Sequence, residues 1–562
     1  MTIHRSLRIG ATRRNTLAAC LAAALAASGA GAAAAGHLSS QSGFHDAFAS
    51  LSSLLDTRQA RTAHPPADPD GGALVTNCDD DGSVGSLREV ITNAVDGDTI
   101  DLRALACPSI ALVSGEILVD VPGLSLLGPG PDLLTIDGGG TGRVFASNHA
   151  LAISDLTLAN GYAEGGTGGC ILVNNGDLAL TRSTVTGCTA GDGTNLESYG
   201  GGIAVFGNLT MESSTVRAST GTAIDVASGG GAYAAGNAYL YASILEGNVV
   251  TAATQRVNGG GLSAIGSVIA YDTRVTGNSA QSTDGLVWGG GIFGQGGVTM
   301  SASTVSGNTV GSSCVDCPIM GGGAFAFGQV RVFYSTINDN HVLSATGSAG
   351  GAAGGGLATF SYGNNGLIGV VNSTVSGNSA TGGANGGTGY GGGIAPLYYS
   401  PFVVANSTIA FNNASDFGGG AVGNSIYTPT LLSAIVAENG APIGPDLASA
   451  IPFTAFSIAG SNNLVMAWDP AIVTVPSGTL TADPELQPLA DNGGPTATHA
   501  ILTGTPAVDT GSNPGDLTYD QRGCPNARVT GAAADIGAFE LQVGLIDRVF
   551  RDGFDGVVTL CQ

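Results

Sequence analysis

Apolar and polar residues alternate along this chain in short stretches that end at glycine or asparagine. Thr304-Val305-Ser306 and Thr374-Val375-Ser376 show the alternation clearly, and residues 99–158 follow it around glycine-rich turns. A period of two residues is typical of β-strands with one buried face, whereas amphipathic helices repeat about every 3.6 residues. The pattern therefore predicts many short strands joined by tight turns.

Two motifs recur along most of the chain, about once every 30 residues. The first is a glycine triplet before an apolar residue, which starts at Gly200, Gly229, Gly259, Gly289, Gly321, Gly354, Gly391 and Gly418, after a degenerate copy at Gly168. The second, of the type Ser-Thr-Val-Ser-Gly-Asn, ends at Asn248, Asn278, Asn308, Asn340, Asn378, Asn412 and Asn439. Strand-type repeats of this length are typical of β-solenoids, in which each repeat forms one coil and neighbouring coils pair through their backbones.

We therefore predict an all-β fold, a right-handed parallel β-helix. Each coil is expected to point one small or branched residue inward, the clearest set being Val275, Val305, Ile337, Val375 and Ile409. The glycine triplets should turn one corner, because positive φ and close backbone approach favour glycine. The repeated asparagines should turn another corner in a left-handed conformation, with their amides joined in a ladder.

One short helix is predicted before the repeats, within residues 85–94. Ser86 can cap its N-terminus, Glu89 occupies the capping-box position, and Leu87 and Ile91 belong to an apolar stripe. A β-helix must cover its open end or expose unpaired strand edges. We expect this helix to close the first coil.

The start of the chain resembles a signal peptide, with arginines, then an Ala/Leu-rich stretch, then small residues. We therefore expect export through a cleaved signal peptide to the extracellular space or the outer-membrane surface. No later apolar run approaches the roughly 20 residues of a membrane helix, so the mature chain should lack a transmembrane segment. The predicted parts are a signal peptide (1–35), a linker (36–72), an N-terminal cap with the first coils (73–158), the repeat array (159–440), a C-terminal region (441–542) and a tail (543–562).

Composition narrows the possible partners. The 562 residues include 92 glycines, and only 11% are charged. Loss of the predicted signal peptide removes four arginines and no acids, which leaves 42 acidic against 14 basic residues. A surface of this charge argues against nucleic acids and anionic membranes. Surface glycans or proteins are the partners that we expect.

Eight cysteines follow the predicted signal peptide, an even number that suits disulfides in an oxidising compartment. They fall as sequence neighbours: Cys78 and Cys107, Cys170 and Cys188, Cys314 and Cys317, Cys524 and Cys561. Local pairing is the simplest hypothesis, although the sequence leaves the connectivity open. Cys314-Val315-Asp316-Cys317 lies in a loop of the repeats without a thioredoxin-like pattern, which indicates a structural disulfide or two free thiols.

Three segments resemble known families. Cys78, followed by Gly85-Ser86-Leu87-Arg88-Glu89, resembles the Cys-Ser-Leu-Arg-Glu-Ala-type N-terminal signature of exported bacterial β-helix proteins, with Gly85 replacing a cysteine. The repeats are similar to those of polymorphic outer-membrane proteins. Asp491-Asn492-Gly493-Gly494-Pro495 and Asp535-Ile536-Gly537-Ala538-Phe539-Glu540 look like a choice-of-anchor C-terminal region. The resemblances cover most of residues 73–542 and imply a pectin-lyase-like fold and a surface or secreted location, without a defined reaction.

Catalytic chemistry finds little support in the repeats. Polysaccharide lyases and hydrolases of this fold need carboxylates and a basic residue, or two carboxylates, on adjacent coils. Residues 168–440 contain only 12 acidic residues and five arginines, and only Arg217 and Glu246 fall in register on neighbouring coils, as an expected exposed ion pair. His341 and His499 are isolated and are interpreted as structural. We assign no catalytic and no cofactor-binding residue.

The function predicted from these features is a secreted or cell-surface structural and adhesion module that binds glycans or proteins along its long face. Tyr239, Tyr241, Tyr271 and Tyr334 are candidates for a stacking stripe on that face, with core or turn filling as the alternative. The alternative function is a polysaccharide lyase or glycoside hydrolase that acts on an acidic polysaccharide. Ca²⁺ is the one candidate cofactor, with Asp79, Asp80 and Asp81 as ligands, because crowded loop oxygens suit a hard cation. A solvated acidic turn is the competing interpretation.

Overall fold

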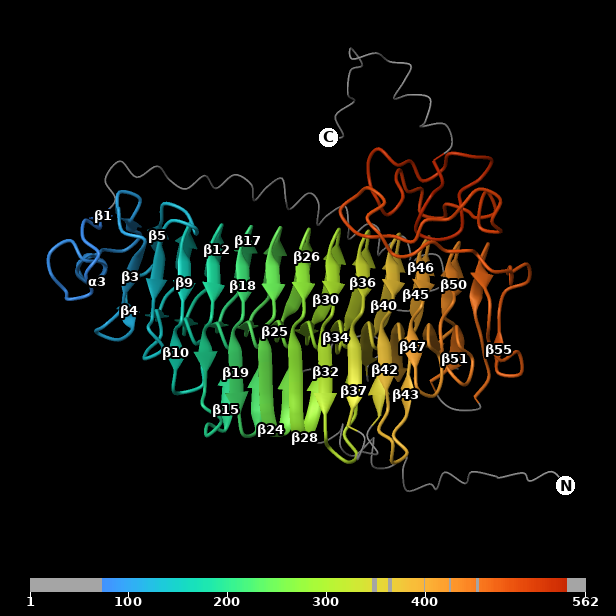
Figure 1. Ribbon diagram of the computed structural model, residues 1–562, viewed down its shortest axis with the longest axis horizontal. Helices are drawn as coiled ribbons and strands as arrows, with labels where there is room; N and C mark the ends of the chain where they lie inside the picture. Colours follow the sequence, from blue (N-terminus) through green and yellow to red (C-terminus); the bar gives the residue numbers. More distant parts are fainter. Residues whose placement is uncertain are drawn as a thin grey trace, which may run out of the picture.

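Strands of successive coils lie side by side in four long sheets that form the body of the molecule (Figure 1). The computed structural model describes residues 73–345, 351–361, 366–398, 400–423, 426–450 and 454–542. Sheets A and D contain 14 strands each, sheet B 13 and sheet C 12, and their strands pair in parallel. About 13 turns stack into a right-handed parallel β-helix, which confirms the predicted fold class.

One coil shows how the chain visits the four sheets. After the triplet at residues 229–231, β21 (Ala232–Ala234) joins sheet C and β22 (Ala238–Tyr241) joins sheet A. The chain continues through β23 (Ile244–Glu246) in sheet B and β24 (Val249–Asn258) in sheet D. The next glycine triplet then starts the following coil.

The glycine triplets turn the corner between sheets D and C, as predicted. Gly229 has a φ of 76°, and the first glycine of each triplet has positive φ. A Cβ atom on Gly229 would lie 2.1 Å from the carbonyl oxygen of Ala232, and one on Gly230 would lie 2.3 Å from that of Gly260. Both left-handed backbone and steric crowding therefore require glycine here.

Two other corners also use left-handed residues. One lies between sheets A and B and contains Asp155, Arg182, Ser213, Ala242, Asp272, Ala302, Tyr334, Asn372, Asn406, Ser433 and Asn462, all with positive φ. The other lies between sheets B and D, where Gly247 and Gly307 stand immediately before the repeated asparagines. The asparagines themselves are not left-handed, so this part of the prediction is wrong. Their side chains are used along the stack instead.

The asparagine ladder itself is confirmed. Asn248 donates from Nδ2 to Oδ1 of Asn278 at 2.9 Å and to the carbonyl of Val216 at 3.0 Å. Oδ1 of Asn278 also accepts the backbone N–H of Asn248 at 3.0 Å. The same bonds repeat through Asn308, Asn340, Asn378, Asn412 and Asn439, and all of these side chains are buried. Each buried amide is thereby satisfied by the coils on either side of it.

The interior is a continuous apolar column that runs from the N-terminal helix to the last coils. The five residues predicted to point inward, from Val275 to Ile409, belong to it and are at most 1% exposed. The stacked strands do not stop at residue 440, because β53 (Ala459–Ser461) and β54 (Leu464–Val465) still pair with sheets A and B. The final coils therefore lie within the predicted C-terminal region.

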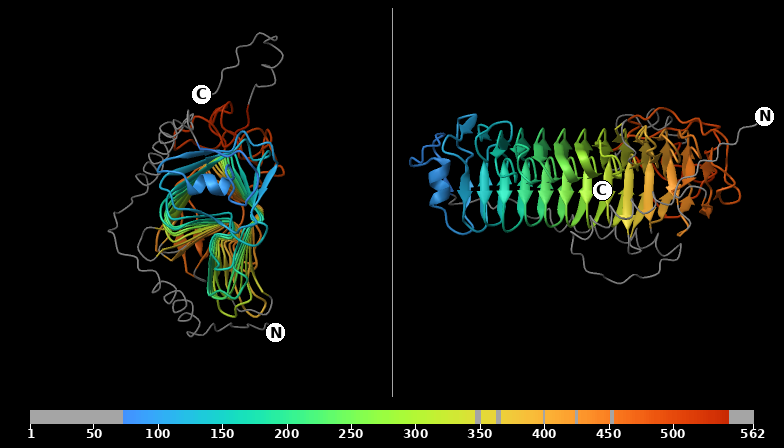
Figure 2. Two further views of the ribbon diagram at one scale, coloured as in Figure 1. Left: turned by 90° about the vertical axis from the view of Figure 1, so that its left-hand side faces the viewer. Right: turned by 90° about the horizontal axis from the view of Figure 1, so that it is seen from below.

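The predicted helix is α3 (Leu87–Thr92), and it lies across the open end of the first coil (Figure 2). Ser86 caps it by accepting a 3.3 Å bond from the N–H of Glu89. The Glu89 carboxylate accepts from the N–H of Gly85 rather than from that of Ser86, a variation on the expected capping box. Leu87 and Ile91 are buried in the interior column, as expected of a cap.

Residues 481–542 form a lobe, the C-terminal lobe, that folds back over the outer face of sheet B near β41 (Thr374–Ser376) and β46 (Thr408–Ala410) (Figure 1). Thr374 donates to Oε1 of Gln521 at 2.6 Å, and Ser376 lies 2.8 Å from Nε2 of His499. Arg528, fully buried in the lobe, pairs with Glu540 at 3.3 Å. Polar bonds thus attach the lobe to the solenoid.

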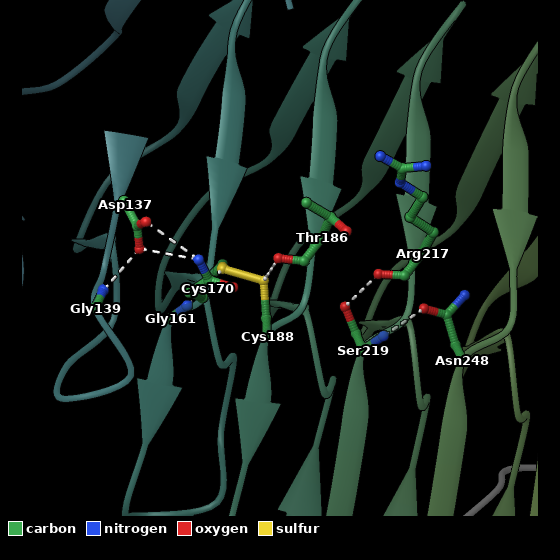
Figure 3. The surroundings of a disulfide bond; sticks show 10 residues. Asp137, Gly139, Gly161, Cys170, Thr186, Cys188, Arg217, Ser219 and Asn248 are labelled. Atoms are coloured by element: carbon green, nitrogen blue, oxygen red, sulfur yellow. Dashed lines mark hydrogen bonds between the residues drawn. A yellow bond between two sulfur atoms is a disulfide. The ribbon is translucent and has the colours of Figure 1, made fainter. Parts of the chain in front are cut away.

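Three of the predicted cysteine pairs are disulfides: Cys78–Cys107, Cys170–Cys188 and Cys314–Cys317. Figure 3 shows the second, in which Cys188 occupies the place of the ladder asparagine one coil before Ser219. Cys524 is also disulfide-bonded. Its expected partner, Cys561, lies outside the described residues.

The predicted signal peptide (1–35), linker (36–72) and tail (543–562) lie outside the described residues. Within the described part, no helix is long and apolar enough to cross a membrane.

Candidate functional site

Sheet D extends beyond the body of the β-helix as a two-layered projection, which we call the flange. In β24 (Val249–Asn258) and β28 (Ser279–Trp288) the chain runs outward and then back, with a left-handed residue, Gln255, at the turn of β24. Small apolar side chains, including Val250, Val257 and Ala280, fill the space between the two layers. The flange is visible below the body in the end-on view of Figure 2. Its returning layer faces the outer surface of sheet C.

An apolar cluster fills most of the angle between the flange and sheet C. Trp288, Phe293 and Phe325 stack with ring centroids 5.7 to 6.3 Å apart, and Phe327 meets them edge-on. The cluster continues through Phe360 and later coils. Because this cluster lies outside the β-helix interior, it is a second core that attaches the flange to the body.

Toward the N-terminal coils, the angle between the flange and sheet C is not filled and forms a groove. We define the groove by its lining residues: Tyr199, Ser228, Tyr233, Arg256, Asn258, Ile265, Trp288, Phe293, Gln295 and Phe327. It encloses about 120 Å³. Ile265, which is 41% exposed, gives it an apolar edge. The lining contains aromatic rings, an arginine and neutral amides, but no carboxylate.

Beside the groove, a row of aromatic side chains on sheet C is interrupted. Tyr233, Ser263 and Phe293 occupy the same position on three successive strands. Strands lie about 4.8 Å apart, so Tyr233 and Phe293 are separated by roughly 10 Å along the stack. The short Ser263 side chain, itself 1% exposed, separates these two rings along the stack.

The flange has a matching gap. Tyr199, Ser228, Asn258 and Trp288 are in register on successive strands of its returning layer. Small polar side chains at Ser228 and Asn258 separate the Tyr199 ring from the Trp288 ring. Tyr199 packs against Tyr233 across the angle at 4.9 Å, which closes one end of the groove.

Three buried polar atoms of the groove make no hydrogen bond within the described residues: Nε1 of Trp288, Oδ1 of Asn258 and Nε of Arg256. Trp288 is 1% exposed and Asn258 is 3% exposed. An unsatisfied buried donor or acceptor costs about 1–3 kcal/mol. Two donors and one acceptor in one groove therefore indicate a site that a polar ligand or water would satisfy.

The electrostatics of the groove are set by few groups. Burial raises the pKa of the Tyr199 phenol, and the hydrogen bond to Glu197, 3.0 Å away, adds to the shift. Burial also raises the pKa of Tyr233, and the charge of Arg256 opposes that shift. Both phenols therefore stay protonated at neutral pH and can donate hydrogen bonds.

Asp79, Asp80 and Asp81 are not among the close groups of potential metal ligands in the described residues. Asp80 is 4% exposed and its carboxylate accepts two bonds from Arg88, at 2.8 and 3.0 Å, and one from each N–H of Val113 and Ser114. Despite desolvation, which raises it, the pKa of Asp80 is lowered by the Arg88 and backbone hydrogen bonds. The carboxylate of Asp81 accepts from the N–H of Ser83. Asp80 therefore joins the cap helix to the first coils.

Within the described residues, one group of potential metal ligands lies close together: Asp284, Cys314 and Cys317. Both sulfur atoms are used in the Cys314–Cys317 disulfide. The disulfide therefore cross-links this loop beside the flange, which agrees with the structural-disulfide interpretation of its sequence.

The structure shows a different ion pair between neighbouring coils from the one that was expected. Arg217 and Glu246 are in register, as predicted, but both are exposed and form no ion pair within the described chain. Arg182 instead pairs with Asp155 at 2.6 Å, and this bond, with the nearby charge of Glu212, raises its pKa. Asp155 precedes the repeats, so this pair was not among those expected in register, and Glu212 lies one position away, opposite Thr181. The left-handed corner brings these groups together because it turns Asp155 and Arg182 outward on adjacent coils.

The proposed tyrosine stripe is also incomplete. Tyr241 and Tyr271 are in register on sheet A, and Tyr239 shares β22 with Tyr241. Tyr334, by contrast, lies under the C-terminal lobe, where burial raises its pKa. His499 is buried, accepts or donates at Ser376 and bonds the carbonyl of Gln487, which supports its structural interpretation.

Sequence reasoning missed the groove. The sequence does carry a signal for it at two positions of each repeat. The residue before the glycine triplet is aromatic at Tyr199 and Trp288, and the second residue after the triplet is Tyr233, Ser263 and Phe293 in successive repeats. Without the flange, nothing shows that these two columns face each other.

The fold and the groove together define a β-helix protein with a lateral groove between its flange and sheet C. No family model, curated protein or solved structure matches the chain.

Proposed function

We propose that this chain is a secreted or cell-surface β-helix module that binds glycans in the groove without cleaving them. The observation that carries the proposal is the unsatisfied pair of Trp288 Nε1 and Asn258 Oδ1, buried beside a gap in an aromatic ladder. A sugar ring offers an apolar face for stacking and hydroxyl groups that both donate and accept. It can therefore occupy the groove beside Tyr233 and Phe293 and satisfy both atoms.

The groove supports binding better than catalysis. Glycoside hydrolysis requires two positioned carboxyl groups, and no carboxylate lines the groove. Neutral hydrogen-bonding groups and rings hold a polyhydroxylated chain without transferring a proton. The rigid stack of coils keeps the site in a fixed geometry, which lowers the entropic cost of binding.

Trp288→Phe tests the proposal, because it keeps the ring and removes only the N–H donor. A screen of oligosaccharides by calorimetry should find a ligand whose affinity falls roughly 3- to 10-fold in this variant. Trp468→Phe is the matched control, because the second tryptophan lies in the last coils and not in the groove. Unchanged binding in Trp288→Phe, or an equal loss in both variants, would contradict the proposed site.

The resemblances to exported β-helix proteins and to the choice-of-anchor region support a surface location for this module. The disulfides are consistent with an oxidising compartment, since they persist where thiols are not kept reduced. Detection of the protein in surface or secreted fractions of the native cell, with its first residues removed, is the test of location.

A polysaccharide-cleaving enzyme is the second candidate. It is favoured by one observation, the cluster of Asp155, Arg182 and Glu212 on adjacent coils. This cluster lies on the outside of the corner between sheets A and B, not in the groove. The two candidate functions therefore depend on different residues and can be separated by mutation.

A further inference from the structure

We infer that the groove selects an acidic saccharide, a uronate, and that Arg256 binds its carboxylate. The inference rests on the proposed glycan-binding function and adds the class of sugar. It starts from the position of Arg256, which lies two residues before Asn258 on the same face of β24.

Arg256 is a partly buried cation without a counterion. Its guanidinium makes no ion pair and no hydrogen bond in the described part of the chain, and its Nε atom is fully buried. In its register column the first acidic residue is Glu197, two strands away, whose carboxylate accepts from the hydroxyl of Tyr199. On the adjacent coil, the carboxylate of Asp225 accepts from the hydroxyl of Thr254 instead. A desolvated, unpaired charge is costly, so an anionic ligand gains energy that a neutral one does not.

The neighbouring groups fix the orientation of such a ligand. Arginine presents two parallel N–H donors that match the two oxygens of a carboxylate. Asn258 and Trp288 follow on the same face of the flange and can bond the hydroxyl groups of the same ring. The ring itself occupies the groove, whose lining includes Tyr233 and Phe293. A pyranose with one carboxylate uses all of these features at once.

The acidic character of the whole protein does not prevent this. The chain has a formal net charge of −24, but residues 168–440 hold only 12 of the 42 acidic residues. Repulsion from distant carboxylates is screened over about 10 Å at 0.1 M salt, whereas a direct, partly buried contact with Arg256 is screened much less. Selectivity should therefore persist at physiological ionic strength.

Calorimetry with three matched oligosaccharides tests the inference: a galacturonate oligomer, the same oligomer as its methyl ester, and a sulfated neutral oligomer. The wild-type protein should bind the galacturonate at least roughly 10-fold more tightly than the ester. Arg256→Gln should abolish this preference and leave the ester affinity within about 2-fold. Arg274→Gln, at an exposed arginine of β27 (Arg274–Thr276), is the control and should change neither affinity.

The outcomes separate the two proposals. Equal binding of the galacturonate oligomer and its methyl ester overturns the uronate inference but leaves glycan binding intact. Binding of the sulfated oligomer alone has the same meaning. Failure of all three sugars to bind also overturns the uronate inference, and the wider oligosaccharide screen then decides the proposed function. Arg256→Lys keeps the charge but loses the two-point geometry, so an intermediate affinity supports the inference and a wild-type affinity contradicts the two-point contact. Thermal unfolding of each variant confirms that it is folded.

Discussion

The side-chain amide of Asn439 donates a 2.9 Å hydrogen bond to Oδ1 of Asp446, so that a buried carboxylate ends the asparagine ladder. The same oxygen accepts the backbone N–H of Asn439, and Oδ2 accepts the N–H groups of Met466 and Ala467. Asp446 thereby replaces the asparagine that a further coil would supply. It joins the last ladder residue to the chain that follows.

This position makes the end of the β-helix sensitive to pH. Burial raises the pKa of Asp446 from 3.8 to about 6, against the opposing effect of its hydrogen bonds. Between these values the folded state keeps a proton that the unfolded state has lost, so stability falls as pH rises and levels off above about 6. In urea unfolding, the stability of the wild type relative to Asp446→Ala should decrease from pH 4 to pH 6.5. A difference that increases over this range would contradict the assigned direction.

Asn308→Ala should destabilise the middle of the solenoid by at least about 3 kcal/mol. The change removes bonds to the carbonyl of Val275, to Asn278 and to Asn340, and leaves buried groups on both neighbouring coils unsatisfied. Since each coil of a solenoid contacts mainly its neighbours, the effect should be greatest close to residue 308. Hydrogen exchange should show the largest loss of protection in the adjoining strands. Asn338→Ala, at a partly exposed side chain, is the control.

The ladder and the strands could be predicted because each depends on one repeat meeting the next. The period of the Asn248-to-Asn439 series shows which residues share a column, and the alternation around Val305 shows which side chains point inward. The left-handed corner was misplaced by one residue, since residue type alone does not separate Gly307 from Asn308. Repeat spacing therefore predicts the contacts between neighbouring coils well, but it predicts the backbone conformation of single residues less well.

The groove and the position of the C-terminal lobe could not be predicted in this way. Trp288 and Phe293 are five residues apart, but their contact depends on the flange turning back on sheet C. Thr374 and Gln521 are 147 residues apart and belong to segments without a common repeat. Neither contact leaves a periodic trace in the sequence. In the sequence, Arg256 likewise looks like any surface arginine, and only the structure shows that it lacks a counterion.

Arg528→Ala should loosen the C-terminal lobe without unfolding the solenoid. The guanidinium is fully buried, donates to the carbonyls of Asp535 and Gly537, and pairs with Glu540, which would be left as a buried charge without its cation. Removal of one partner from a buried ion pair costs about 3–5 kcal/mol. Limited proteolysis should cut within residues 481–542 faster in this variant. Arg103→Ala, which breaks an exposed ion pair with Asp101, should leave the cleavage pattern unchanged.

The last prediction concerns catalysis. General acid–base chemistry needs positioned ionisable groups close to the substrate, and the groove offers none as a carboxylate. Purified protein should therefore leave pectate and alginate uncleaved, with and without Ca²⁺, when lyase products are followed by ultraviolet absorbance and hydrolysis products by reducing ends. If cleavage occurs, the cluster around Arg182 is the place to test, because Asp155 and Glu212 flank it on adjacent coils. Arg182→Ala should then abolish turnover, while Trp288→Phe should leave it intact. That result would favour the interpretation of the protein as a β-helix polysaccharide lyase over that of a binding module. Loss of turnover in Trp288→Phe alone would instead place the chemistry in the groove and contradict the division between binding and catalysis.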